Sequence, residues 1–354
     1  MENNNSHSPF KGLAGNFRHS RYTGPNKPDL KKILKWIGLG FLIFIGVSLI
    51  LSATAIALLS INLPDVHNLD KLAVPQSTTI YDREGNVLYV KFGAENRKYI
   101  KLSQMSPNII HATLAIEDAQ FYSHPGFDLV GLVRAGLNDI SGGPQQGGST
   151  ITQQYIKLTF LSSKKSIIRK IKELILAIRL EQVFSKNTIL EKYLNKIPYG
   201  NNAYGIEKAA QTYFNKSAKD LTIAESAILA AIPQNPSYYN PYGIHKYSKL
   251  AATANIKKIA LRNVQIEANL RHSEIQRGLL GQIIKIGNNN VYIQGRADLV
   301  LKRMQETHYI TQKEFNKIKS EFTKITFTKY IQSIKAPHFV MDVITQLENK
   351  YGTD

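Results

Sequence analysis

The chain has 354 residues and is 43% hydrophobic, which is enough for one or two folded domains with substantial cores. Its net charge of +19 favours an anionic partner: nucleic acid, anionic lipid or a phosphorylated substrate. The absence of cysteine excludes disulfide bonds and thiolate catalysis.

The first 63 residues predict a membrane anchor. The stretch from Trp36 to Pro64 carries no charge, and it exceeds the roughly 20 apolar residues that a bilayer core requires. We therefore expect a transmembrane helix over residues 36–63. The competing interpretation is a cleaved signal peptide, but its apolar region is usually only about 7–15 residues long.

Residues 1–35 form a basic tail with seven Lys and Arg side chains and two acidic ones. The positive-inside rule places this tail in the cytoplasm and the rest of the chain outside. A basic domain outside the cytoplasm argues against nucleic acid. It favours the anionic bilayer surface or a lipid-linked phosphate.

Residues 64–106 are predicted to be a linker with short strands at 78–81 and 87–92, on either side of the turn DREGN. Helices are expected over 108–120, 128–138, 166–184, 188–196 and 206–214. In the 166–184 helix, six apolar residues share one face: Ile167, Ile168, Ile171, Leu174, Ile175 and Ile178. Thr222 and Glu225 match a capping box that opens the next helix, which ends before Pro233.

The last third continues this pattern with one hairpin. The basic segment 246–277 is expected to be helical, strands at 283–286 and 291–294 flank the turn GNNN, and helices follow at 298–307 and 311–319. The predicted fold class is mainly α, with minor β structure in the linker and in a C-terminal hairpin.

The segment EDAQFYSHPGF, residues 117–127, is the first candidate for chemistry. Glu117 and Asp118 lie at the C-terminal end of an apolar helix, where the helix dipole disfavours negative charge. A carboxylate kept there among apolar and aromatic neighbours suits a general base. The alternative is a solvated acidic pair without a catalytic role.

The polar run GGSTITQQ, residues 147–154, is the second candidate. Its glycines allow close backbone approach, and its hydroxyl and amide groups offer many donors and acceptors. It is equally compatible with a solvated loop leading into a helix that Ser149 or Thr150 caps. Lys157 would follow one turn later and could point toward the same ligand, although a solvated lysine is the ordinary case.

The segment RKIKELILAIRLE, residues 169–181, is the third candidate. Arg169 and Glu173 are four positions apart and share the helix face opposite the apolar stripe. They could form an ordinary surface ion pair. They could also belong to a cleft wall in which one carboxylate lies among cations that suit a pyrophosphate, namely Lys164, Lys165, Arg169, Lys170 and Lys172.

Together these segments resemble the glycosyltransferase family 51 domain, the peptidoglycan polymerase module of class A penicillin-binding proteins. The three candidates are similar to its first three motifs, residues 186–214 to its fourth and residues 221–241 to its fifth. The match runs in order over about residues 76–242, behind the predicted anchor. It implies a lysozyme-like, bilobal α-helical fold for the core at 107–242.

The resemblance also implies the reaction. The substrate would be lipid II, and the acceptor 4-hydroxyl would join the donor MurNAc C1 with inversion and release of undecaprenyl pyrophosphate. Glu117 would be the general base, and Glu173 would position the pyrophosphate or a bound cation. Phe121 would shape the pocket of the base. The implied substrate contacts are Gly148, Ser149, Thr150, Gln153, Gln154, Lys157, Arg169 and Lys170. No cofactor is certain, but a divalent cation, Mg²⁺ or Mn²⁺, is compatible with the pyrophosphate.

The chain departs from the family pattern in several places. Leu158 stands where the family usually has Asn, and Lys165 where it often has Arg. Residues 243–295 look like an insertion before the C-terminal helices at 296–333. Residues 334–354 resemble the start of the linker to a transpeptidase domain that is absent, so we expect a fragment or a truncated gene product.

Two other functions remain open. A lysozyme-like lytic enzyme would share the fold class, but it has no pyrophosphate to stabilise in the third motif. A non-catalytic scaffold could bind lipid II and recruit partners. In the leading interpretation the chain lies in the bacterial cytoplasmic membrane with its N-terminus inside. It would act on lipid II and the growing glycan strand, alongside cell-wall synthesis or division proteins.

Overall fold

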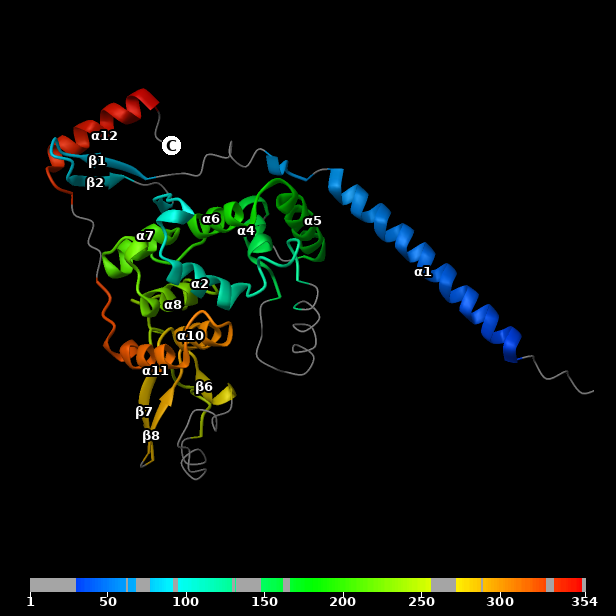
Figure 1. Cartoon of the computed structure of the whole chain (residues 1–354). Coiled ribbons are helices and arrows are strands. Elements are labelled where there is room, and N and C mark those ends of the chain that lie inside the picture. Colours follow the sequence, from blue (N-terminus) through cyan, green and yellow to red (C-terminus); the bar gives the residue numbers. More distant parts are fainter. Residues whose placement is uncertain are drawn as a thin grey trace, which may run out of the picture. The chain divides into compact units, whose positions relative to one another are not determined.

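The computed structural model describes residues 30–61, 63–67, 77–91, 95–128, 131, 148–161, 166–255, 272–287, 289–328 and 334–351. The chain divides into two compact units, Met1–Leu58 and Leu59–Asp354. Each unit is described by itself (Figure 1).

The first unit is dominated by α1 (Leu30–Ile61). Its stretch Leu34–Ile61 has a mean hydropathy of 2.6, and no part of its most apolar window is buried by other residues. At 1.5 Å per residue, 28 residues extend about 42 Å, which exceeds the roughly 30 Å of a bilayer core. By length and composition, this helix can cross a membrane.

The second unit is built mainly of helices that share one hydrophobic core. Its central group is α2 (Pro107–Glu117), α8 (Ile223–Ala231) and α10 (Arg296–Glu306), which pack on one another (Figure 1). Beside it, α4 (Ile151–Phe160) packs on α5 (Ile167–Val183) and α6 (Lys186–Lys196). Two further helices are α7 (Ile206–Phe214) and α11 (Gln312–Glu321). The predicted mainly α class is confirmed, whereas its lysozyme-like, bilobal character stays a prediction.

Side-chain caps explain where several helices begin. The hydroxyl of Ser106 accepts from the Asn108 backbone N–H, and Pro107 occupies the first turn of α2, where a missing N–H costs nothing. Full capping boxes open α4, α8 and α11, as predicted for α8 from Thr222 and Glu225. These local signals account for the good agreement between expected and observed helix starts.

The described strands form short pairs. β1 (Thr78–Tyr81) and β2 (Val87–Lys91) are antiparallel, and α12 (Pro337–Tyr351) contributes Val340 and Ile344 to a small cluster with Ile80. β3 (Asn96–Arg97) runs parallel to β4 (Ala203–Tyr204), which ties the linker to the loop before α7. β7 (Gln282–Ile286) and β8 (Asn289–Ile293) form the predicted hairpin.

Two expectations about secondary structure are wrong, and a third falls almost entirely outside the described residues. Residues 246–277 are not helical where they are described, because β5 (Lys249–Leu250) pairs with β6 (Ile275–Gln276). The first long helix ends at Glu117 rather than at residue 120, since Asp118 leaves helical geometry with φ −163°. The helix expected at 128–138 lies almost entirely outside the described residues.

The apolar stripe of α5 does not face the core. Ile167 is 82% exposed and Ile168 is also exposed, whereas the buried face carries Glu173, Leu176, Ala177 and Leu180. Periodicity identifies an apolar face but not what covers it. Here α4 packs on α5 while the isoleucines at the start of α5 stay exposed.

Candidate active site

Glu117, the last residue of α2, is held by a chain of hydrogen bonds. Its side chain is 13% exposed, and its Oε2 accepts from Nε2 of Gln154 at 2.7 Å. The Oε1 of Gln154 accepts in turn from the buried hydroxyl of Tyr193 at 3.1 Å. Thus α2, α4 and α6 each contribute one side chain to fixing this carboxylate.

The second oxygen of Glu117 is differently placed. Oε1 is buried and has no hydrogen-bond partner among the described residues, and the nearest cation, Nη2 of Arg296, lies 3.8 Å away. Burial, and next the negative charge of Glu117, raise the pKa of the Tyr193 hydroxyl, so Tyr193 stays a donor. We call Glu117, Gln154, Tyr193 and Arg296 the base cluster. It presents one carboxylate oxygen with its lone pairs unused.

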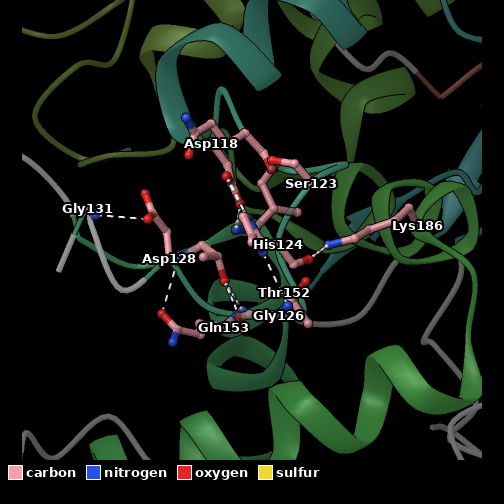
Figure 2. Close-up of polar contacts among 12 residues, drawn as sticks. Asp118, Ser123, His124, Gly126, Asp128, Gly131, Thr152, Gln153 and Lys186 are labelled. Carbon is pink, nitrogen blue, oxygen red and sulfur yellow. Dashed lines mark hydrogen bonds and ion pairs between the residues drawn. The ribbon is translucent and has the colours of Figure 1, made fainter.

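Asp118, the neighbour of Glu117, has a structural role. Its Oδ2 accepts from the backbone N–H of Ile151 at 3.0 Å, at the positive N-terminal end of α4. The ring of His124 donates from Nε2 to the same carboxylate at 2.9 Å, while its Nδ1 accepts from the Gly126 N–H (Figure 2). The acidic pair is therefore not solvated, and Asp118 joins the 117–127 segment to α4.

A second group of polar side chains lies between α4 and α5. Nζ of Lys170 donates to Oγ of Ser149 at 2.7 Å, to Oε1 of Gln153 at 3.4 Å and to the carboxylate of Glu173. Glu173 is buried, whereas the Lys170 side chain is 40% exposed. We call these four residues the lysine cluster. Gln153 and Gln154 are consecutive residues of α4, but they belong to different clusters. Gln153 accepts from Lys170, which pairs with Glu173, whereas Gln154 donates to Glu117.

Other residues predicted to form the site are placed as follows. Thr150 caps α4 and donates from Oγ1 to the Gly126 carbonyl at 2.7 Å, and Gly148 lies half-buried just before it. Lys157 is exposed on α4. Arg169 is half-buried, with a buried Nε that has no hydrogen-bond partner among the described residues. Phe121 is fully buried in the core.

Phe121 and the end of α5 are held by a shared cation. Nζ of Lys186 lies 4.5 Å from the centroid of the Phe121 ring and donates to the His124 carbonyl at 2.6 Å (Figure 2). It also pairs with Glu181 at 2.7 Å, and Thr152 donates to that same carboxylate. This network fastens the 117–127 segment to α4 and α5.

Sequence reasoning missed two members of the base cluster. Tyr193 lies within the fourth motif but looks like an ordinary core residue there. Arg296 opens α10, outside every motif, and follows Glu117 by more than half the length of the chain. No periodicity or spacing joins residues so far apart, so contact between them emerges only from the packing of α10 on α2.

The divalent cation expected at the pyrophosphate stays a prediction. No group of three or more His, Asp or Glu side chains within them could hold a metal ion. Glu173, the carboxylate expected to serve one, already accepts from the ammonium of Lys170.

Comparisons with known proteins agree with the motif order. A family model described as transglycosylase matches residues 84–263. Penicillin-binding protein 2D of Bacillus subtilis (strain 168) is 35% identical over 312 residues, covering 88% of this chain and 39% of its own. Penicillin-binding protein 1A of Aquifex aeolicus (strain VF5) is 36% identical over 292 residues, covering 82% and 34%.

Penicillin-binding protein 1A of Rickettsia prowazekii (strain Madrid E) is 43% identical over 204 residues, covering 56% of this chain and 26% of its own. A crystal structure of penicillin-binding protein 1A from Haemophilus influenzae aligns with 80% of this chain at 20% identity, but its TM-score of 0.36 is too low to establish a shared fold. The chain spans well under half the length of these relatives. Because the family model covers about half of the chain, the chain belongs to the transglycosylase family.

Proposed function

We propose that this chain is a peptidoglycan glycosyltransferase that polymerises lipid II into glycan strands. The observation that carries the proposal is the state of Glu117. Its carboxylate is shielded from water and fixed through Oε2, while Oε1 has no hydrogen-bond partner in the described part of the chain. A general base needs this combination of fixed orientation and an unused lone pair.

The proposed reaction is a single displacement at the donor sugar. Oε1 of Glu117 takes the proton of the acceptor 4-hydroxyl as that oxygen attacks C1 of the donor MurNAc. The bond from C1 to the pyrophosphate oxygen breaks, and undecaprenyl pyrophosphate leaves with the electron pair. Attack opposite the leaving group inverts C1, so the base and the cations that bind pyrophosphate belong on opposite sides of the sugar.

The lysine cluster and its neighbours are suited to the leaving group. Lys157 lies on α4, and Arg169 and Lys170 lie on α5, which packs against α4. Positive charge here would lower the barrier for a departing pyrophosphate. The carboxylate of Glu173 accepts from Lys170 and thereby orients its ammonium. In this proposal Ser149 and Gln153 hold the same ammonium between turnovers and contact substrate when it binds.

The proposal includes a membrane setting. Lipid II is anchored in a bilayer, α1 is long and apolar enough to cross one, and exposed Ile167 and Ile168 open the helix that carries the lysine cluster. We propose that the N-terminus is cytoplasmic and that the second unit lies outside the bacterial cytoplasmic membrane. Cell-wall synthesis or division proteins are the proposed partners.

The test is polymerisation of labelled lipid II by the full chain in detergent, with products separated by gel electrophoresis. Glu117→Gln should reduce the rate by about 10²-fold or more, the usual contribution of a general base. Glu306→Gln is the matched control, because Glu306 is an exposed glutamate at the far end of α10 that pairs with Arg303. Undiminished polymerisation by Glu117→Gln would show that its assigned role is wrong.

Two further outcomes identify the other candidate functions. Release of soluble muropeptides from cell-wall sacculi without consumption of lipid II would indicate a lytic enzyme. Binding of lipid II by the unaltered chain without turnover would indicate a scaffold.

A further inference from the structure

Arg296 is a buried cation fixed from three directions. Its side chain is 11% exposed, and its Nε donates to the carbonyl of Ala231, the last residue of α8, at 3.0 Å. The guanidinium carbon lies 5.7 Å from the centroid of the Tyr239 ring, a favourable cation–π placement. The third contact is with Glu117, at 3.8 Å.

The contact with Glu117 is electrostatic rather than a hydrogen bond. At 3.8 Å, Nη2 is too far from Oε1 to consume its lone pair, yet near enough for a strong attraction in a water-poor site. Burial lowers the pKa of Arg296, and the charge of Glu117 acts in the opposite direction. The two charges therefore stabilise one another, and the lone pairs of the buried Oε1 stay unused by the described residues.

Arg296 directly follows residues 243–295, which the sequence suggested to be an insertion and which we call the inserted segment. The backbone N–H groups of Arg296 and Ala297 donate to the carbonyls of Gly278 and Leu279, both at 2.9 Å. Leu279 donates to the His245 carbonyl at 2.9 Å, so three stretches of backbone are hydrogen-bonded in succession. The start of α10 is thus seated on the inserted segment rather than on a loop.

Glycines make this seating close. A Cβ at Gly278 would lie 2.3 Å from the backbone carbon of Tyr247, and one at Gly295 would lie 2.3 Å from that of Leu280. Neither position tolerates a side chain without moving the backbone. The position of Arg296 relative to α2 therefore depends on residues that belong to none of the five motifs.

We propose that Arg296, held by the inserted segment, is a positioning residue that fixes the orientation of the Glu117 carboxylate for attack by the acceptor hydroxyl. This inference rests on the proposed glycosyltransferase function. It gives the described stretches at 245–248 and 278–280 a role in catalysis, because they seat the cation that orients the base. Arg296 itself touches no reacting atom.

Charge, rather than shape, should determine the effect of replacing Arg296. Arg296→Gln keeps a donor for the Ala231 carbonyl but removes the charge, whereas Arg296→Lys keeps the charge. With the full chain and lipid II, we expect Arg296→Gln to lower kcat about 10- to 100-fold, comparable to misplacing a reacting group by about 1 Å, with KM unchanged. Arg296→Lys should recover most of kcat. Arg303→Gln, an exposed arginine on the same helix, is the matched control and should leave kcat unchanged.

Gly295→Ala tests the seating independently. It leaves Arg296 in the chain but forces the start of α10 away from Leu280, so kcat should again fall with KM unchanged. Unchanged kcat in this variant would remove the role given to the inserted segment.

The remaining outcomes are all decisive. Equal loss in Arg296→Gln and Arg296→Lys, or a rise in KM with kcat unchanged, would overturn the inference while Glu117→Gln remains inactive and the proposed function stands. An Arg296→Gln chain that fails to fold when Arg296→Lys folds would reveal a structural cation and also overturn it. Inactivity of the unaltered chain would overturn the proposed function, and this inference with it.

Discussion

Replacing Lys170 by methionine should destabilise the second unit, because it leaves the buried carboxylate of Glu173 without its cation. Lys170 is the ammonium on which Ser149, Gln153 and Glu173 converge. Methionine has a similar length and keeps the apolar contacts of the stem, but it cannot donate a hydrogen bond. The carboxylate then stays buried without its cation.

The expected cost lies between two limits. Breaking a fully buried ion pair costs about 3–5 kcal/mol, whereas exposed pairs are worth about 0–1 kcal/mol. Glu173 is buried, but Lys170 is 40% exposed, so water replaces part of the lost interaction. We therefore expect a loss of about 2 kcal/mol, which lowers Tm by roughly 4 °C or somewhat less, because the shift per kcal/mol falls as the unit grows.

The measurement is thermal unfolding of the full chain in detergent, without substrate, followed by far-ultraviolet circular dichroism. The single tryptophan, Trp36, lies in α1, so tryptophan fluorescence would report on the wrong unit. Lys172→Met is the control, since Lys172 lies on the same helix and makes no ion pair within the described ranges. Equal stabilities for the two variants would refute the reasoning about Glu173.

Three further predictions concern stability. Gly126→Ala should cost at least about 1 kcal/mol, because φ is +90° and a Cβ would lie 3.0 Å from the Ala177 carbonyl oxygen; an unchanged Tm would contradict it. Thr222→Ala should cost about 1 kcal/mol by removing the cap of α8, and Thr222→Ser should restore it in the same unfolding assay. Burial lowers the pKa of His111, so its neutral form is favoured in the folded state and stability is lost as pH falls below about 6.5. His111 stacks on the ring of Tyr309, with 4.3 Å between the ring centroids, and His111→Phe keeps an aromatic ring there. The Tm of this variant should therefore rise relative to the unaltered chain from pH 8 to pH 5, and a constant difference would count against it.

Local patterns predicted the elements of the fold well. The helix at 206–214 has the expected bounds, and the capping box of Thr222 and Glu225 is present. The hairpin around the GNNN turn forms within a residue or two of its expected strands. In each case the deciding interaction joins residues a few positions apart, which is the range over which a sequence pattern carries information.

Packing decided what the patterns left open. The six apolar residues of α5 correctly predict an amphipathic helix, but the face carrying Glu173 is the buried one. Sequence favoured a core face because apolar residues usually face inward, and Lys170 removes much of the cost of burying a carboxylate instead. The segment 246–277 was likewise predicted to be helical. In the structure Ser248 donates to the Gln294 carbonyl, and this contact fixes an extended backbone.

One part of the candidate site was predicted from the sequence, and another part was not. Residues 149–154 and 169–173 were expected to act together, and the structure brings Ser149, Gln153, Lys170 and Glu173 into contact. Arg296 could not be foreseen, because a basic residue at the start of a helix is ordinary. Its proximity to Glu117 depends on how α10 packs on α2.

Gln154 restricts how this chain can vary. A single amide donates through its nitrogen to Glu117 and accepts through its oxygen from Tyr193. Glutamate would set two carboxylates against each other, lysine would donate without accepting, and methionine would do neither. Asparagine has the right polarity but is one methylene too short to span both partners. Active chains recovered from a library of all substitutions at this position should therefore retain glutamine.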